Sequence, residues 1–101
     1  MVVPSDLGRP QPGIVVQGGE FNADLSTILV CPVSSDLQDR LLLRPLIEVA
    51  PKNGLRLRSQ IMTDKLVALR RDGIRRVIGR IDAETSEQLD RALLLLLGLA
   101  R

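Results

Sequence analysis

A buried strand is predicted for Thr27-Ile28-Leu29-Val30-Cys31-Pro32-Val33, which is followed directly by Ser34 and Ser35. Five of its seven residues are aliphatic or cysteine, and β-branched side chains are typical of strands. Two adjacent hydroxyls at the exit of a buried strand have two interpretations. They either begin a turn by bonding their own backbone, or they lie at the mouth of a site and bind a phosphate. The turn is the commoner role for serine, and this stretch alone leaves both open.

Working outward from this stretch, the sequence predicts short strands separated by loops. Residues 4–12 contain three prolines and are expected to form a loop, and Pro51-Lys52-Asn53-Gly54 is a strong turn signal. Residues 34–38 are polar and predict a turn, and residues 20–25 and 70–75 predict a turn or a single helical turn. The strand segments are expected at residues 1–3, 13–17, 40–49 with a break near Pro45, 60–69 as one bent or two segments, and 76–81.

One helix is predicted, and it begins after Asp82. Aspartate is a good N-cap because its carboxylate accepts a hydrogen bond from a backbone N–H of the first turn, and Gly98 is expected to end the helix. Apolar side chains at helical spacing form one face, which comprises Leu89, Ala92, Leu93, Leu96 and Leu97. Leu94 and Leu95 make the last turns apolar nearly all round, which predicts packing inside the core or a subunit interface. Several short strands followed by one helix predict a small, mainly β, α+β domain with a curled antiparallel sheet or barrel.

The composition excludes several classes of protein. The 101 residues fit one domain. One Phe and no Trp or Tyr exclude RNA-binding modules that stack bases on aromatic rings, and the absence of His excludes an imidazole base or a His metal site. The single cysteine, Cys31, forbids an internal disulfide and suits a reducing cytoplasm. The longest apolar run, residues 92–97, is too short to span a bilayer, so no membrane association is expected.

The charges are concentrated in the middle of the chain. Residues 51–80 carry nine basic and two acidic side chains, although the net charge of the whole chain is only +2. A strongly basic segment predicts either a face that binds a polyanion or a solvated surface whose charges are balanced by residues folded over from elsewhere. The sequence favours neither.

A carboxylate within this basic segment is a candidate for catalysis. Asp64 lies next to Lys65, and a carboxylate beside cations keeps a low pKa and stays ionised. Such a group can accept a proton from a ribose 2′-hydroxyl while a cation stabilises the negative charge that develops on the phosphate. The alternative is a structural ion pair between neighbouring segments, which spacing alone favours.

Several motifs then follow one another in a characteristic order. They are Gly8-Arg9-Pro10-Gln11-Pro12-Gly13-Ile14-Val15-Val16-Gln17, Glu20-Phe21-Asn22, Val30-Cys31-Pro32-Val33-Ser34-Ser35, the segment 54–65 ending in Thr63-Asp64-Lys65, and the segment 78–99. This ordered set resembles the MazF/PemK-type toxins of type II toxin–antitoxin systems, over nearly the whole chain.

The resemblance implies an SH3-like curled antiparallel β-barrel with a C-terminal helix, formed by residues 1–101 as one domain whose first strand is shortened. It implies a cytoplasmic homodimer that cleaves single-stranded RNA, including mRNA, at short sequences and leaves a 2′,3′-cyclic phosphate. The reaction uses no metal and no other cofactor. A cognate antitoxin covers the RNA groove and neutralises the toxin.

The resemblance also assigns residues. The family's catalytic Thr falls on Ser34, its usual catalytic Arg falls on Gln11, and Arg9 in the same loop is a substitute cation. The Asp of the PemK branch falls on Asp64, and that branch's Arg two residues earlier falls on Met62. The residues expected to bind RNA are Ser35, Lys52, Arg56, Arg58 and Lys65.

Two other functions stay open. Because Gln11 and Met62 replace cations of the family, the chain is alternatively a catalytically weakened member that acts as an antitoxin-binding module. The gyrase poison CcdB shares the fold, but it uses a Trp near its C-terminus, and this chain contains no Trp.

Overall fold

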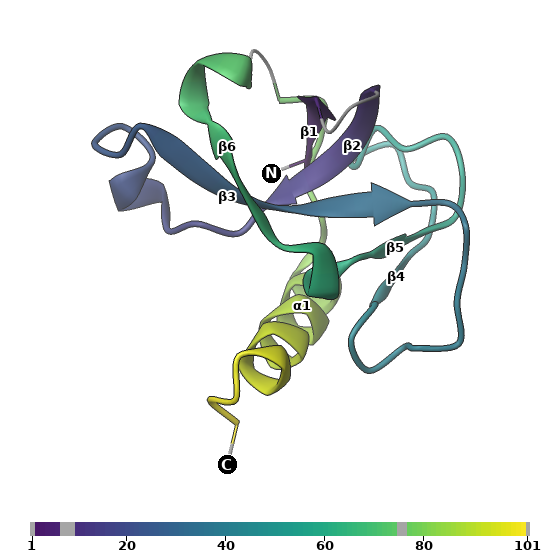
Figure 1. Ribbon diagram of the computed structural model, residues 1–101. Helices are drawn as coiled ribbons and strands as arrows, with labels where there is room; N and C mark the ends of the chain where they lie inside the picture. The colour runs from purple at the N-terminus through teal and green to yellow at the C-terminus, as the bar shows by residue number, and fades with distance from the viewer. Residues whose placement is uncertain (1, 7–9, 75–76, 101) are drawn as a thin grey trace.

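The sheet is centred on β3 (Thr27–Ser34), the stretch from which the fold was predicted. The computed structural model describes residues 2–6, 10–74 and 77–100. Three strands pair antiparallel with β3. β2 (Pro10–Val15) pairs with residues Val30–Pro32 of β3, and β6 (Val67–Arg70) pairs with Thr27–Val30. β5 (Ser59–Ile61) pairs with Val33 and Ser34. Since β6 and β5 pair with successive halves of β3, the sheet bends around this strand (Figure 1).

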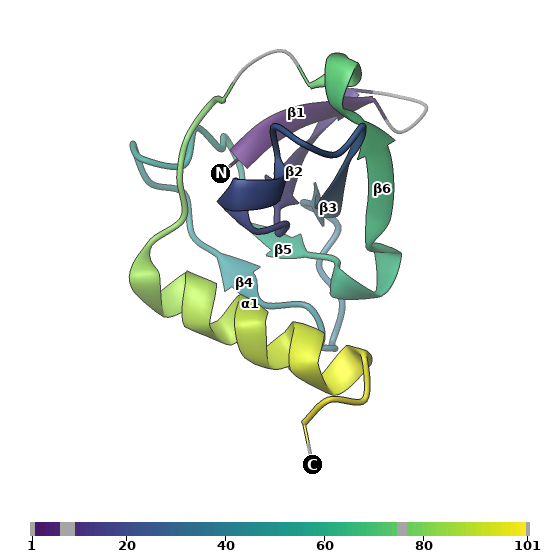
Figure 2. The same cartoon turned by 90° about the vertical axis from the view of Figure 1, so that its left-hand side faces the viewer.

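Two outer strands complete a curled antiparallel half-barrel. β1 (Val2–Asp6) pairs with β2, and β4 (Leu46–Ile47) pairs with β5, so the strand order is β1-β2-β3-β5-β4 with β6 beside β3. Three single 3₁₀ turns lie in the connections: η1 (Gly19–Phe21), η2 (Thr63–Lys65) and η3 (Arg71–Gly73). Figure 2 shows the C-terminal helix α1 (Ala83–Leu96) lying across the end of the sheet next to β4. The mainly β fold class predicted from the sequence is confirmed.

An aliphatic core fills the space between the curled sheet and α1. Along β3, Val30, Cys31 and Val33 are all buried, so both faces of this strand are covered at that point. The core cluster comprises Val2, Ile14, Cys31, Val33, Ile47, Leu55, Ile61 and Leu89. A core without aromatic rings is what the composition predicts.

The helix begins and ends as predicted. The Asp82 side chain accepts a hydrogen bond of 2.8 Å from the backbone N–H of Thr85, and Gly98 adopts a φ of +72° just after the helix. Leu89 and Ala92 are buried against the sheet. Leu97, which was expected on the buried face, is 56% exposed because it is the residue that ends the helix. Among the described residues, no helix is long and apolar enough to cross a membrane.

The predicted loop at residues 4–12 is wrong in part. β1 extends to Asp6 and β2 begins at Pro10, and the two strands pair antiparallel from Val2 opposite Ile14 to Asp6 opposite Pro10. Pro4 lies in β1 at the edge of the sheet, where a residue without a backbone N–H is tolerated, and Pro10 and Pro12 lie in β2 opposite Asp6 and Pro4. Burial of Val2 and Val3 overrides the proline signal.

Other strand predictions were too long. Of residues 40–49 only Leu46 and Ile47 form a strand, because the apolar run before them has no strand to pair with. Residues 60–69 are two strands separated by η2, one of the two predicted alternatives. Of the strand predicted at residues 76–81, the described part contributes one bridge, Gly79 to Val2, and residue 76 lies outside the described residues.

Candidate functional site

Ser34 is the last residue of β3, and its hydroxyl begins a turn. The Oγ atom accepts a hydrogen bond of 3.0 Å from the backbone N–H of Asp36. The turn interpretation is therefore confirmed, but it does not use up the hydroxyl, because its own proton is still available to donate. Ser35 follows and is exposed, so two hydroxyls lie where the strand leaves the sheet.

Gln11 lies at the same end of the sheet as Ser34. The described pairing of β2 with β3 ends at Gly13 opposite Pro32, and Gln11 and Ser34 each lie two residues beyond that pair. Gln11 is half-buried in β2, so its placement is set by the strand. Arg9, the predicted substitute cation, lies outside the described residues.

Asp64 forms a two-point ion pair with Arg44. Arg44 Nε donates to Asp64 Oδ1 at 2.9 Å, and Arg44 Nη2 donates to Oδ2 at 2.8 Å. The Arg44 side chain is 7% exposed and that of Asp64 is 31% exposed. The hydrogen bonds from Arg44 hold the pKa of Asp64 below its usual value. The carboxylate is thus ionised as predicted, and the predicted alternative of an ion pair between neighbouring segments is present.

Ser34 ends β3, whereas Asp64 lies in η2, which follows β5. Ser34 is opposite Gln60, whereas Met62, just before η2, donates its backbone N–H to Pro32 O at 2.8 Å. The negative charge of Asp64 also acts on Cys31. No hydrogen bond among the described residues joins Ser34 to Asp64.

Sequence reasoning missed Arg44. The residue lies in the apolar run from Leu41 to Ile47, which was interpreted as a strand, and its partner is 20 residues away in the chain. A single cation within an aliphatic run was the available signal, since arginine is almost never buried without a partner.

Two further polar side chains are buried and bond the connection between β3 and β4. Gln60 in β5 is 1% exposed, and its amide bonds both backbone groups of Gln38: Oε1 accepts from Gln38 N at 2.7 Å and Nε2 donates to Gln38 O at 2.9 Å. Thr63 is fully buried, and its hydroxyl donates to Leu43 O. Together with the Arg44–Asp64 pair, these contacts fasten both ends of the connection between β3 and β4, which we call the β3–β4 loop (residues 35–45).

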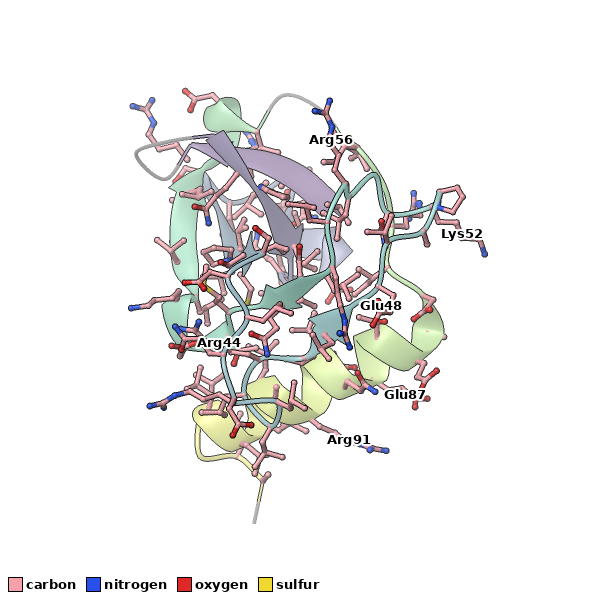
Figure 3. The ribbon with its side chains drawn as sticks, turned by 90° about the vertical axis from the view of Figure 1, so that its right-hand side faces the viewer. Arg44, Glu48, Lys52, Arg56, Glu87 and Arg91 are labelled. Atoms are coloured by element: carbon pink, nitrogen blue, oxygen red, sulfur yellow. The ribbon has the colours of Figure 1, made fainter. Side chains whose placement is uncertain are left out.

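The residues expected to bind RNA come from three places in the fold: the connection from β4 to β5, η2, and the segment after β3. Figure 3 shows Lys52 and Arg56 pointing outward, far from Arg44. Arg58 forms an exposed ion pair with Glu48 at 2.8 Å. Lys65 is exposed in η2 beside Asp64, and Ser35 follows Ser34 directly in the chain.

Part of the charge of the basic segment is engaged in contacts within the fold. Arg70 pairs with Asp72, and Arg71 donates to the backbone carbonyls of Asn22 and Ala23. Arg75 and Arg76 lie outside the described residues. Its described arginines are therefore partly engaged in contacts within the fold.

The described part of the chain contains no thiolate nucleophile and no cluster of metal-ligating side chains. Burial raises the pKa of the Cys31 thiol to about 12, so it is a neutral core side chain and not a thiolate nucleophile. Within residues 2–6, 10–74 and 77–100, no group of three or more Cys, Asp or Glu side chains is placed to hold a metal ion.

Known proteins share this fold and much of this sequence. A probable endoribonuclease MazF of Mycolicibacterium smegmatis is 36% identical over 93 residues, which are 92% of this chain and 84% of that protein. The structure of the Mycobacterium tuberculosis toxin MazF-mt6 matches with a TM-score of 0.88 at 18% identity, and covers 99% of this chain and 98% of that one. An endoribonuclease solved with its cognate antitoxin, from a mycobacterial species, matches with a TM-score of 0.83 at 19% identity, over 99% and 93% of the two chains.

A match to a family model covers the whole candidate site. A family model described as the PemK-like, MazF-like toxin of type II toxin–antitoxin systems matches residues 2–97, which include every described strand and α1. The predicted resemblance is confirmed, and the chain belongs to this family of toxins.

Proposed function

We propose that this chain is an endoribonuclease that cleaves single-stranded RNA, including mRNA, at short sequences. The observation that carries the proposal is its 36% identity, over 92% of its length, to a probable endoribonuclease. The cluster at the end of β3 supports it, because the hydroxyls of Ser34 and Ser35 lie where the strand leaves the sheet, and Gln11 lies at the same end.

The proposed reaction is an internal transfer at phosphorus. The ribose 2′-oxygen attacks the adjacent phosphorus, the bond from phosphorus to the 5′-oxygen breaks, and a 2′,3′-cyclic phosphate remains. The 2′-hydroxyl loses its proton to a base, and the departing 5′-oxygen gains one from solvent or an acid. Donors aimed at the phosphate oxygens stabilise the charge that develops there, which is the proposed role of Ser34 and Gln11.

Asp64 is the proposed proton acceptor, with Arg9 or Lys65 as the accompanying cation. Its lowered pKa keeps it ionised at neutral pH. Arg44 bonds both oxygens, but each carboxylate oxygen has a second lone pair, and the side chain is 31% exposed. The chemistry requires no metal and no cofactor.

The proposed partners follow from the same family. A cognate antitoxin is supported by a structural relative that was solved with its own antitoxin. A homodimer is supported by the exposed leucines at the end of α1, and the single reduced cysteine fits a cytoplasmic location.

The direct test is to incubate the purified protein with single-stranded RNA of varied sequence in EDTA and to measure the fragment ends by mass spectrometry. We expect fragments that end in a cyclic phosphate. Ser34→Ala and Asp64→Asn should each lower the rate of cleavage by about 10²-fold or more. Ser59→Ala is the matched control, because its hydroxyl bonds Leu57 O away from Ser34.

Intact RNA in the presence of folded protein would contradict the proposal. It would favour the catalytically weakened, antitoxin-binding member of the family, in which Gln11 stands where a catalytic arginine is usual. Cleavage that disappears only when EDTA is added would contradict the metal-free mechanism.

A further inference from the structure

One buried side chain, Gln60, holds the turn that follows Ser34. Gln60 Oε1 accepts from the Gln38 backbone N–H at 2.7 Å, and Gln60 Nε2 donates to the Gln38 carbonyl at 2.9 Å. Because one planar amide bonds both polar backbone groups of Gln38, it fixes the position and the orientation of that residue. Gln38 is therefore held as it would be by a partner strand.

Gln60 also lies directly across from Ser34. The two residues are partners in the β3–β5 register. Gln60 thus bonds through its side chain to one end of the segment 34–38, and it pairs as a strand residue with the other end. Within the segment, the backbone N–H of Asp36 donates to Ser34 Oγ. The orientation of the serine hydroxyl therefore depends on a turn that Gln60 closes.

Burial indicates that this glutamine has a specific role. All three residues of β5 are buried, and Gln60 is 1% exposed. An amide in such a place destabilises the fold unless its donors and acceptors are satisfied, and an aliphatic side chain would avoid the problem. The amide is satisfied by the β3–β4 loop at Gln38, so the polar residue is coupled to that loop.

We propose that Gln60 is a positioning residue that orients the Ser34 hydroxyl for the reaction by closing the turn at residues 34–38. The inference rests on the ribonuclease function proposed above. Gln60 itself does not touch RNA, because it is buried beneath the loop. Its effect is on the placement of the hydroxyl, and small misplacements of a reacting group are costly to the rate.

The first test replaces Gln60 with methionine, which keeps the volume and removes both hydrogen bonds. We expect kcat to fall by about 10- to 100-fold, with KM changed by less than about threefold, because the transition state needs the oriented hydroxyl more than binding does. Retention of full kcat by folded Gln60→Met overturns the proposal.

Gln60→Glu provides a pH-dependent rescue. A neutral carboxyl group can donate to Gln38 O and accept from Gln38 N as the amide does, whereas a carboxylate can only accept. Burial raises the pKa of such a carboxyl, so the kcat of Gln60→Glu relative to wild type should recover as the pH falls. A ratio that stays constant with pH contradicts the role.

Asn53→Leu is the matched control. Asn53 is 4% exposed, and its side-chain amide donates to Glu48 O at 2.8 Å and accepts from Leu55 N at 3.0 Å, in the connection from β4 to β5. This variant should lose stability as Gln60→Met does but keep kcat within about threefold, since it leaves the turn at Ser34 closed. Equal losses of kcat in both variants would reduce Gln60 to a merely structural residue and overturn the proposal.

Amide hydrogen exchange separates this inference from the proposed function. Exchange at Asp36 and Gln38 should be faster in Gln60→Met than in wild type and unchanged in Asn53→Leu. If wild-type protein cleaves no RNA, the ribonuclease proposal and the positioning role both fail, and the exchange data still decide whether Gln60 holds the turn. Unchanged exchange in Gln60→Met overturns the inference whatever the activity.

Discussion

At the scale of single residues, the most consequential contact is the one that sequence reasoning missed. Arg44 is buried and bonds both oxygens of Asp64, so the carboxylate is part of an ion pair as well as a candidate base. A buried guanidinium that lost its partner would remain desolvated without compensation. The pair therefore couples the β3–β4 loop to η2.

Arg44→Met should lower the free energy of unfolding by about 1–3 kcal/mol at pH 7. Arg44 lowers the folded-state pKa of Asp64 below its unfolded value of about 4. The stabilisation is therefore present above about pH 4 and is lost as the pH falls through the folded pKa. Urea unfolding at pH 7 and at pH 3 measures the difference, which should shrink at the lower pH.

The control for this prediction is Arg70→Met. Arg70 pairs with Asp72 at 3.0 Å, but the two side chains are 84% and 72% exposed. An exposed pair contributes little, so this variant should stay within about 0.5 kcal/mol of wild type. If Arg44→Met lowers the free energy of unfolding no more than Arg70→Met does, the buried pair does not stabilise the β3–β4 loop.

At the scale of elements, the turn at residues 51–54 packs against residues 78–80 without room for side chains. A Cβ on Gly79 would lie 2.4 Å from the carbonyl carbon of Asn53 and 2.5 Å from Lys52 O. The backbone N–H of Arg80 donates to Lys52 O at 2.6 Å. The segment that leads into α1 is thus positioned by close contact between two backbones.

Gly79→Ala should destabilise the protein by about 1–3 kcal/mol, because the added methyl forces these backbones apart. Thermal unfolding followed by circular dichroism measures the loss. Gly73→Ala is the control, since a Cβ there meets nothing within 4 Å, and its melting temperature should be nearly unchanged. Equal melting temperatures for the two variants would show that the backbones separate at no cost.

At the scale of the whole molecule, the end of α1 leaves apolar surface uncovered. Leu94 and Leu95 are 44% and 42% exposed, and Leu97 is 56% exposed. The sequence left two interpretations of the leucines at the end of α1, packing inside the core or a subunit interface. Because these three side chains are exposed, they do not pack inside the core. A contiguous apolar patch on a small domain is typical of an interface, which fits the proposed homodimer.

Leu95→Lys should convert the proposed dimer to a monomer, because a buried unpaired charge at an interface costs several kcal/mol. Light scattering at micromolar concentration measures the change in mass. Leu25→Lys, at a residue that is 46% exposed after η1, should leave the mass unchanged. A wild-type protein that is already a monomer would contradict the dimer and remove this role from the leucines.

Local sequence determined the elements whose signals lie within a few residues. The aliphatic run of β3 and the cap at Asp82 required no distant partner, because strand burial and helix capping act over short spans. Ser34 was found as a candidate for the same reason, since it follows the strand directly. The order of motifs along the chain carried the family, which the comparisons then confirmed.

Only the tertiary structure decided which side chains meet. Asp64 bonds Arg44, and Gln60 bonds Gln38, across 20 and 22 residues of chain, and no local pattern specifies such partners. The extent of β1 depended on the pairing of Val2 with Ile14, which outweighed the prolines between them. The partners of Arg58 and Arg70 in the basic segment were also decided there, because charge counted along the chain contains no information about which side chains meet.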